Sequence, residues 1–333
     1  MGKCHKLLLA VVAGLLFLAA GEARAAETRF MNFAAPPGSS NYYPYWVAVA
    51  KAVQNAYPEF KINVSESQGA IDIVRKIRAG MTPVGNSQSN SDYDNYHGLG
   101  LFKGKPNKEA RIMWYFDESP IQLIVLEEAN VKTIKDLEGK KFNPGGTGTA
   151  TAIITRLIMD TLGVKPKYFE AGQGSASDAV ANRQIVGTVK TGNILGPDSY
   201  VMQIKASVPV DLISLTPEEQ KAVSEKYPYM IPWTIPAGQY DWIAHDTNTV
   251  KIAMGATTTT KLSQEDGYRM IAAVMSPEGR KVVDAAFPNG AKQDTIQLTL
   301  QSKTPLHAGT VQYLHEQGVE VPAELIPDEY VKK

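Results

Sequence analysis

The chain has 333 residues, with 34 basic residues, 34 acidic residues and a single cysteine, Cys4. An even charge balance provides no electrostatic footprint for nucleic acid or for an anionic membrane surface, so neither partner is expected. One cysteine cannot form an internal disulfide or a cysteine metal site. Stability must therefore come from a packed core, and the length is ample for one core or for two lobes.

The first 26 residues have the three parts of a cleavable secretory signal. Lys3 and Lys6 form a positive start, residues 7–20 are apolar, and residues 23–25 place alanines on both sides of an arginine. The apolar run is shorter than the roughly 20 residues that a membrane-spanning helix needs. We therefore expect residues 1–26 to be removed during export and the protein to be periplasmic. Removal of three basic residues and one acidic residue leaves 31 and 33 of each kind, and no cysteine.

The rest of the chain alternates short β-like runs with helical patterns. In chain order we expect a strand at Thr28–Ala34, a helix at Pro44–Ala56, a strand at Lys61–Ser65, a helix at Ala70–Ala79 and a strand at Thr82–Ser87. The order then restarts with strands at Ile121–Leu126 and Lys140–Asn143, a helix at Thr149–Leu162, a strand at Lys167–Glu170, a helix at Ala176–Asn182 and a strand at Val186–Thr191. A Pro- and Trp-rich stretch at Tyr227–Trp242 precedes a strand at Thr249–Thr257 and a helix at Gln264–Met275. This alternation predicts parallel βαβ units and an α/β fold.

Two successive sets of such elements predict two lobes. The chain is expected to cross between them near Trp114–Val125 and again near Asp246–Thr258. We assign residues 27–118 and 253–333 to lobe 1 and residues 119–252 to lobe 2. Ligands of α/β folds bind outside the carboxyl ends of the strands, so the expected site is the cleft between the lobes.

Three strand-to-helix loops at this predicted cleft share one chemistry. They are residues 36–44, which include Ser39, Ser40 and Asn41, residues 88–93 and residues 144–149. Each leaves unpaired backbone N–H groups at the positive end of a helix, beside hydroxyls or amides, and this suits a carboxylate, sulfonate or phosphate. Any one of these loops could be an ordinary helix cap. Three of them at one face favour a binding site.

Catalysis, metals and cofactors have little support in the sequence. The histidines after residue 26 are scattered without metal-ligand spacing: His97, His245, His307 and His315. A Gly-x-Ser-x-Gly nucleophile turn is absent, and the Gly-rich loop at 145–149 lacks the lysine of a Walker motif. We interpret Asp117 and Glu118 as polar surface beside the hinge. The expectation is a binding protein without catalysis or cofactor; an exported bilobed enzyme and a sensor-partner protein are the alternatives from other classes.

Six short segments, taken in order, resemble the TAXI family of solute-binding proteins, which serve tripartite ATP-independent periplasmic (TRAP) transporters. They are Asn41–Pro44, Val84–Ser89 with Tyr93 and Gly98, Gly146–Thr149, Thr191–Gly192, Tyr227–Tyr229 followed by Thr234–Gly238, and Pro305–His307 with Gly309. No segment is specific alone, but six in order span nearly the whole mature chain. The resemblance implies a type II periplasmic-binding-protein fold, in which two α/β lobes joined by crossover strands close on a small organic solute, often amino-acid-like or a dicarboxylate. It also implies a membrane permease as partner; a receptor for an ABC-type importer is the alternative.

The loops and the resemblance together predict a polar ligand-binding set. Its members are Ser39, Asn41, Tyr42, Tyr43, Gln68, Gln88, Ser89, Tyr93, Thr147, Gly148, Thr149, Gln173, Lys190 and Thr191. Hydroxyls in this set would donate to a carboxylate, and Tyr42 would wall the site. Two positions depart from the family: Asn90 stands where an aspartate is usual, and Lys190 where an aromatic is common. Both changes favour a more anionic, less amine-bearing ligand; the alternative for Lys190 is that it points to solvent, because strand side chains alternate between the two faces of a sheet.

Overall fold

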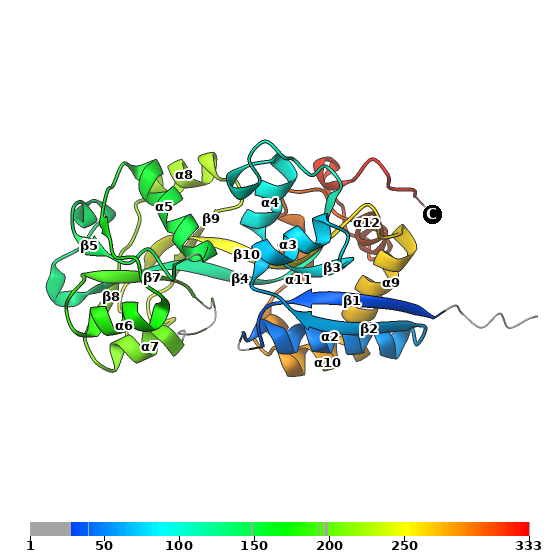
Figure 1. Ribbon diagram of the computed structural model, residues 1–333, viewed down its shortest axis with the longest axis horizontal. Helices are drawn as coiled ribbons and strands as arrows, with labels where there is room; N and C mark the ends of the chain where they lie inside the picture. Colours follow the sequence, from blue (N-terminus) through cyan, green and yellow to red (C-terminus); the bar gives the residue numbers. More distant parts are fainter. Residues whose placement is uncertain are drawn as a thin grey trace, which may run out of the picture.

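The computed structural model describes residues 28–38, 40–147, 149–192, 194, 196 and 199–332. The expected signal at residues 1–26 and two predicted site residues, Ser39 and Gly148, lie outside the described residues. Figure 1 shows an elongated molecule with a group of helices and strands at each end. Two long antiparallel strands, β4 (Ala110–Leu126) and β10 (Thr247–Thr259), run from one group into the other.

The first group is built on the parallel strands β2 (Phe60–Glu66), β1 (Arg29–Ala35) and β3 (Val84–Gln88), in that order. One half of β10 pairs antiparallel with β3, and β4 pairs with β10. Its helices are α2 (Tyr42–Ala56), α3 (Ala70–Arg78), α4 (Ser89–His97), α9 (Gln264–Met275), α10 (Pro277–Ala286), α11 (Thr295–Leu300) and α12 (Ala308–Glu316), with 3-10 turns at Gly100–Phe102, Gly290–Lys292 and Ala323–Leu325. Parallel strands in the order 2-1-3 are of the doubly wound kind, whose ligands bind outside the carboxyl strand ends.

The second group is built on the other halves of the two long strands. The strands β7 (Gly187–Thr191) and β8 (Val210–Leu212) pair with β4, and β9 (Ile231–Ile235) pairs with β10. The remaining elements are β5 (Lys141–Phe142), β6 (Lys167–Tyr168), α5 (Ala150–Leu162), α6 (Gln173–Ala181), α7 (Ser199–Lys205) and α8 (Pro217–Lys226), with 3-10 turns at Glu127–Ala129 and Ile134–Leu137. Among the described strands, only β4 and β10 belong to both ends of the sheet, which makes them the structural link between the groups.

The α/β fold class predicted from the sequence is confirmed, because helices alternate with the strands of a mixed sheet. Helix α9 has the predicted bounds, since Ser263 caps its start and Ser276 with Pro277 begins the next helix. The predicted strand at Ile121–Leu126 is only the last third of β4. The polar residues Asp117, Glu118 and Ser119 interrupt the apolar run, so the sequence pattern does not predict the rest of this strand. The strand is nevertheless buried along its whole length.

The expected loop at residues 88–93 is wrong. Helix α4 begins at Ser89, directly after β3, where the Gln88 N–H donates to Ser91 Oγ at 3.2 Å and the Ser91 hydroxyl donates to the Gln88 carbonyl at 2.8 Å. The side chains of the first helical turn, including Asn90 and Asp92, are consequently buried and do not form an exposed polar loop. A run of short polar residues favours a loop in a sequence pattern, but the residues after Gln88 form capping hydrogen bonds and begin a helix.

The core of the first group is aromatic and fixes the position of α2. Tyr45 stacks on Phe116 with ring centroids 3.8 Å apart, and its hydroxyl accepts a hydrogen bond of 2.7 Å from the indole N–H of Trp114. Trp46 donates to the Asn86 side chain at 3.0 Å. Each buried ring therefore removes a large apolar area from water while its polar atom keeps a partner. This packing holds the N-terminus of α2 against the middle of β4.

A buried ion pair joins the two long strands. Lys251 Nζ of β10 lies 2.6 Å and 2.7 Å from the two carboxylate oxygens of Glu118 of β4, and both side chains are 7% exposed. The ammonium also lies 4.0 Å from the centroid of the Trp233 ring on β9. Asp117 and Glu118 are 2% and 5% exposed, so the interpretation of this acidic pair as polar surface is wrong.

Candidate ligand-binding site

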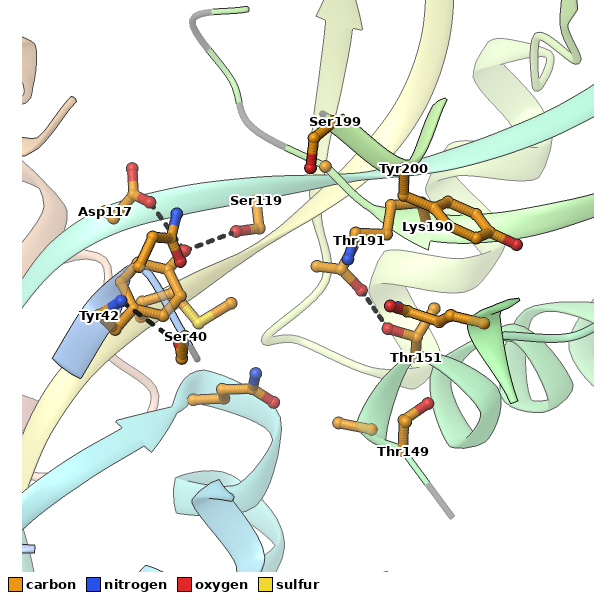
Figure 2. A pocket seen from close by; sticks show the side chains of 16 residues that line it. Ser40, Tyr42, Asp117, Ser119, Thr149, Thr151, Lys190, Thr191, Ser199 and Tyr200 are labelled. Carbon is orange, nitrogen blue, oxygen red and sulfur yellow. Dashed lines mark hydrogen bonds between the residues drawn. The ribbon is translucent and has the colours of Figure 1, made fainter. Parts of the chain in front are cut away.

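A polar cavity of about 480 Å³ lies between the two groups, beside the middle of β4 (Figure 2). Its volume falls in the range of small-molecule sites, roughly 300–1,000 Å³. The residues that line it from the first group and from the middle of the long strands are Ser40, Asn41, Tyr42, Gln88, Asp117, Ser119 and Met254. Those that line it from the second group are Thr149, Ala150, Thr151, Gln173, Lys190, Thr191, Gly192, Ser199 and Tyr200. A solute bound here would contact both groups.

Tyr42, at the start of α2, is held in place by polar and aromatic contacts. Its hydroxyl donates to Asp117 Oδ2 at 2.9 Å and lies 3.5 Å from Ser119 Oγ. Its ring packs edge-on against Phe116 and at a tilt against Phe287, with centroids 5.7 Å and 5.4 Å apart. These contacts make the ring a fixed wall of the cavity.

Asp117 places a carboxyl group in the cavity wall. One of its oxygens accepts from Tyr42, and the other has no hydrogen-bond partner among the described residues. Burial raises the pKa of Asp117 to about 7, against the lowering effect of the Tyr42 hydrogen bond. The charge of Glu118, the neighbouring acid on the same strand, acts in the same direction as burial. Asp117 therefore releases its proton at a higher pH than an exposed aspartate does.

The N-terminus of α5 forms the facing side of the cavity. Thr149 caps this helix: its Oγ1 accepts from the Ala152 N–H at 3.3 Å and donates to the Gly146 carbonyl at 2.7 Å. The N–H groups of the first turn, at Ala150 and Thr151, have no acceptor within the helix. Both residues line the cavity, so the positive end of the helix dipole faces it.

Lys190 adds a positive charge on the same side. It lies on β7 opposite Gln122 of β4, and its ammonium is 5.8 Å from the centroid of the Tyr200 ring. The hydroxyls of Thr151 and Thr191 lie 2.6 Å apart at its flank. An ammonium group, a helix N-terminus and hydroxyl donors together suit an anion.

The structure brings half of the predicted binding set to this cavity. The predicted residues that line it are Asn41, Tyr42, Gln88, Thr149, Gln173, Lys190 and Thr191. The predicted residues that are described but do not line it are Tyr43, Gln68, Ser89, Tyr93 and Thr147. The residues that sequence reasoning left out of the set include Asp117, Ser119, Thr151, Ser199 and Tyr200.

Residues outside the cavity have structural contacts of their own. Ser89 Oγ accepts from the Ala253 N–H at 3.1 Å and lies 3.5 Å from the Tyr229 carbonyl, so it ties α4 to β10. Tyr93 packs against the Tyr229 ring with centroids 5.4 Å apart. Thr147 is exposed. For Asp117, a useful signal was available in the sequence, namely a carboxyl group inside a long apolar run.

Asn90 does not line the cavity. It is 4% exposed in the first turn of α4, and its side-chain oxygen has no hydrogen-bond partner among the described residues. The inference of a less amine-bearing ligand from this position therefore loses its basis. Lys190 does line the cavity, and among the described lining residues the acidic one is Asp117, on the opposite side (Figure 2).

Comparison with solved structures finds similar chains at low sequence identity. A ligand-free TctC solute-binding protein from Polaromonas is 14% identical over 78% of this chain and 88% of that chain, with a TM-score of 0.49. MatC from Rhodopseudomonas palustris with bound malate is 12% identical over 79% and 89%, with a TM-score of 0.48. The aliphatic sulphonate-binding protein SsuA from Escherichia coli is 10% identical over 91% and 97%, with a TM-score of 0.45.

Within the described ranges, no helix combines the length and the apolar composition that crossing a membrane requires. The model of the NMT1-like family matches residues 33–318, which is most of the sequence. The match includes most of both groups of elements, the two long strands and every described residue that lines the cavity. This chain therefore belongs to the NMT1-like family.

Proposed function

We propose that this protein is a periplasmic receptor that binds a small organic anion in the cavity and delivers it to a TRAP-type membrane permease. The observation that carries the proposal is the construction of the cavity from two sides. The N-terminus of α2 and the Tyr42 hydroxyl lie on one side, and the N-terminus of α5 with Lys190 lies on the other. A solute that contacts both sides stabilises the state in which they are close.

The proposed moving bodies are lobe 1, residues 27–118 and 253–333, and lobe 2, residues 119–252. Their boundaries fall in the middle of β4 and of β10, the strands shared by both groups. A register shift between Met254 and Gly255 disturbs the pairing of β10 with β4 close to the second boundary. Local irregularity in a ladder gives the strands a place to bend.

The TRAP assignment is supported by the six segments that resemble the TAXI family. The alternative is delivery to an ABC-type importer. Reconstitution with the membrane proteins encoded beside this chain separates the two: solute uptake driven by an ion gradient without ATP supports the TRAP type, and uptake that requires ATP contradicts it. Return of the unmodified solute after uptake is expected of a receptor, whereas chemical conversion by the purified protein would indicate an enzyme.

Replacing Lys190 with methionine is expected to weaken binding of the anion by about 10- to 100-fold, because a charge-assisted hydrogen bond contributes roughly 1.5–3 kcal/mol. A thermal-shift screen of carboxylates and sulfonates selects the anion that raises the melting temperature most. Isothermal titration then compares Lys190→Met with Lys167→Met, a change at an exposed lysine of β6. Equal affinity of both variants would remove Lys190 from the site.

Ligand binding is also expected to compact the molecule, because closure brings α2 and α5 closer across the cavity. Small-angle X-ray scattering, with and without a saturating concentration of the anion selected above, measures the change in radius of gyration. The Lys190→Met variant at the same anion concentration is the control and should compact less. An unchanged scattering profile of the saturated wild-type protein would contradict closure.

A further inference from the structure

A buried acid stands behind a hydroxyl of the cavity lining. The Tyr42 hydroxyl donates to Asp117 Oδ2 at 2.9 Å, and Asp117 is 2% exposed whereas Tyr42 is only partly buried. Figure 2 shows this pair on one side of the cavity and Lys190, Thr151 and Thr191 on the other. The two ends of the cavity therefore differ in their hydrogen-bonding character.

The carboxylate determines which way the tyrosine hydroxyl points. A phenol has one hydrogen, and a phenol that donates it to a carboxylate offers its oxygen lone pairs to other partners. Donation to an ionised acceptor is also stronger than donation to a neutral one. The Tyr42 oxygen consequently acts as a hydrogen-bond acceptor at its end of the cavity, with the Ser119 hydroxyl 3.5 Å away, while the Lys190 end presents donors.

We infer that the cavity selects a bipolar solute, with an anionic group directed toward Lys190 and the N-terminus of α5 and an ammonium or hydroxyl group that donates to the Tyr42 oxygen. This inference rests on the proposed function of the cavity and adds the polarity of its ligand. Asp117 acts in it as a positioning residue, because it reaches the solute through Tyr42.

An acceptor-only solute would be disfavoured at this end. A keto or ether oxygen placed against the Tyr42 oxygen sets lone pair against lone pair and gains no hydrogen bond from the phenol, whose hydrogen is donated to Asp117. Burial raises the pKa of Asp117 to about 7, the hydrogen bond from Tyr42 lowers it, and the charge of Glu118 raises it. Binding is therefore measured at pH 8.5, where Asp117 is ionised.

Isothermal titration of the full mature chain uses acids matched in carbon skeleton that differ only at carbon 2. The sets are alanine, lactate and pyruvate; aspartate, malate and oxaloacetate; and glutamate, 2-hydroxyglutarate and 2-oxoglutarate. Taurine, isethionate and ethanesulfonate form the sulfonate set. Within the set that binds, we expect the amine- or hydroxyl-bearing member to bind about 10- to 100-fold more tightly than the acceptor-only member or the member without a donor. The amine and hydroxyl members of each set distinguish the two donors.

Two variants test the role of the pair. Asp117→Asn can donate its amide N–H to the Tyr42 oxygen and leave the phenol hydrogen for the solute, so the preference is expected to reverse toward the keto acid. Tyr42→Phe removes the hydroxyl and should bring the ratio of the two affinities close to one. Tyr43→Phe, a change at the next residue of α2, which does not line the cavity, is the matched control and should keep the wild-type ratio.

The possible outcomes distinguish a failure of the proposed function from a failure of the inference about ligand polarity. If no carboxylate or sulfonate binds, the proposed function fails and the inference falls with it. If anions bind but the acceptor-only members bind as tightly as the others, the inference is overturned and the proposed function stands. A wild-type preference that survives unchanged in Asp117→Asn assigns the selection to another residue and also overturns it. The wild-type ratio is decisive even where a variant fails to fold.

Discussion

Replacing Lys251 with methionine is expected to lower the free energy of unfolding by about 3–5 kcal/mol, because it leaves the Glu118 carboxylate buried without its counter-ion. Both side chains are 7% exposed, so water cannot replace the lost partner. The change also removes the contact of the ammonium with the Trp233 ring. Urea unfolding at pH 7.5, followed by circular dichroism, measures the effect.

The double variant Glu118→Leu with Lys251→Met tests the cause. It removes both charges, and we expect it to recover most of the stability lost in the single variant, since a buried ion pair contributes little beyond an apolar pair of similar volume. The exposed pair Lys221–Glu225, with side chains 75% and 68% exposed, is the control, and Lys221→Met should cost less than about 0.5 kcal/mol. A Lys251→Met protein as stable as wild type would contradict this prediction, because it would show that the Glu118 carboxylate does not need Lys251 as its counter-ion.

The second large effect expected is a loss of stability as the pH rises from about 4 to about 7.5, caused by buried aspartates. Burial raises the pKa of Asp92 to about 7, against hydrogen bonds from Ser87 and Tyr115, and raises the pKa of Asp94 to about 6. The folded state therefore holds protons that the unfolded chain has released. Stability from such a group is complete below the unfolded pKa, near 4, and is lost as the pH rises through the folded pKa.

The Asp92→Asn variant isolates the largest contribution. Its stability should fall less between pH 4.5 and pH 7.5 than that of wild type, by about 2–4 kcal/mol, because the amide has no proton to release. Carboxyls with lowered pKa values, such as Asp72, change stability in the opposite direction in both proteins and cancel in this difference. Asp178→Asn, at an exposed position of α6, is the matched control. Parallel profiles of wild type and Asp92→Asn would contradict a protonated Asp92 in the folded state.

The elements of the fold could be predicted from local sequence wherever periodicity and capping agree. Helix α9 begins after Ser263 and ends at Met275, as its cap and apolar spacing indicate. The helix predicted at Thr149–Leu162 differs from α5 only in its first residue, since Thr149 is the N-cap, and the structure places Thr149 at the cavity. Caps and periodicity are interactions within a few residues, so one sequence carries them completely.

The full length of β4 was not predictable in this way. Asp117, Glu118 and Ser119 interrupt its apolar run and read as surface, yet all three are buried. The backbone pairing with β10 and the ion pair of Glu118 with Lys251 come from more than 130 residues away in the chain, and the Asp117 carboxyl accepts from Tyr42, 75 residues away. Local patterns cannot report a partner at that distance.

The residues of the candidate site show the same difference between local and long-range information. The sequence alone determined the α/β class, the polar helix starts and the residues Tyr42, Thr149, Lys190 and Thr191 as candidates. Only the tertiary structure decided that Ser89 and Tyr93 support packing, that Asn90 lies outside the cavity, and that Asp117 stands behind the Tyr42 hydroxyl. The physical reason is that a helix cap depends on residues that are neighbours in sequence. The polarity of the cavity depends instead on residues that are far apart in sequence and that β4 and β10, by running through both groups, bring face to face.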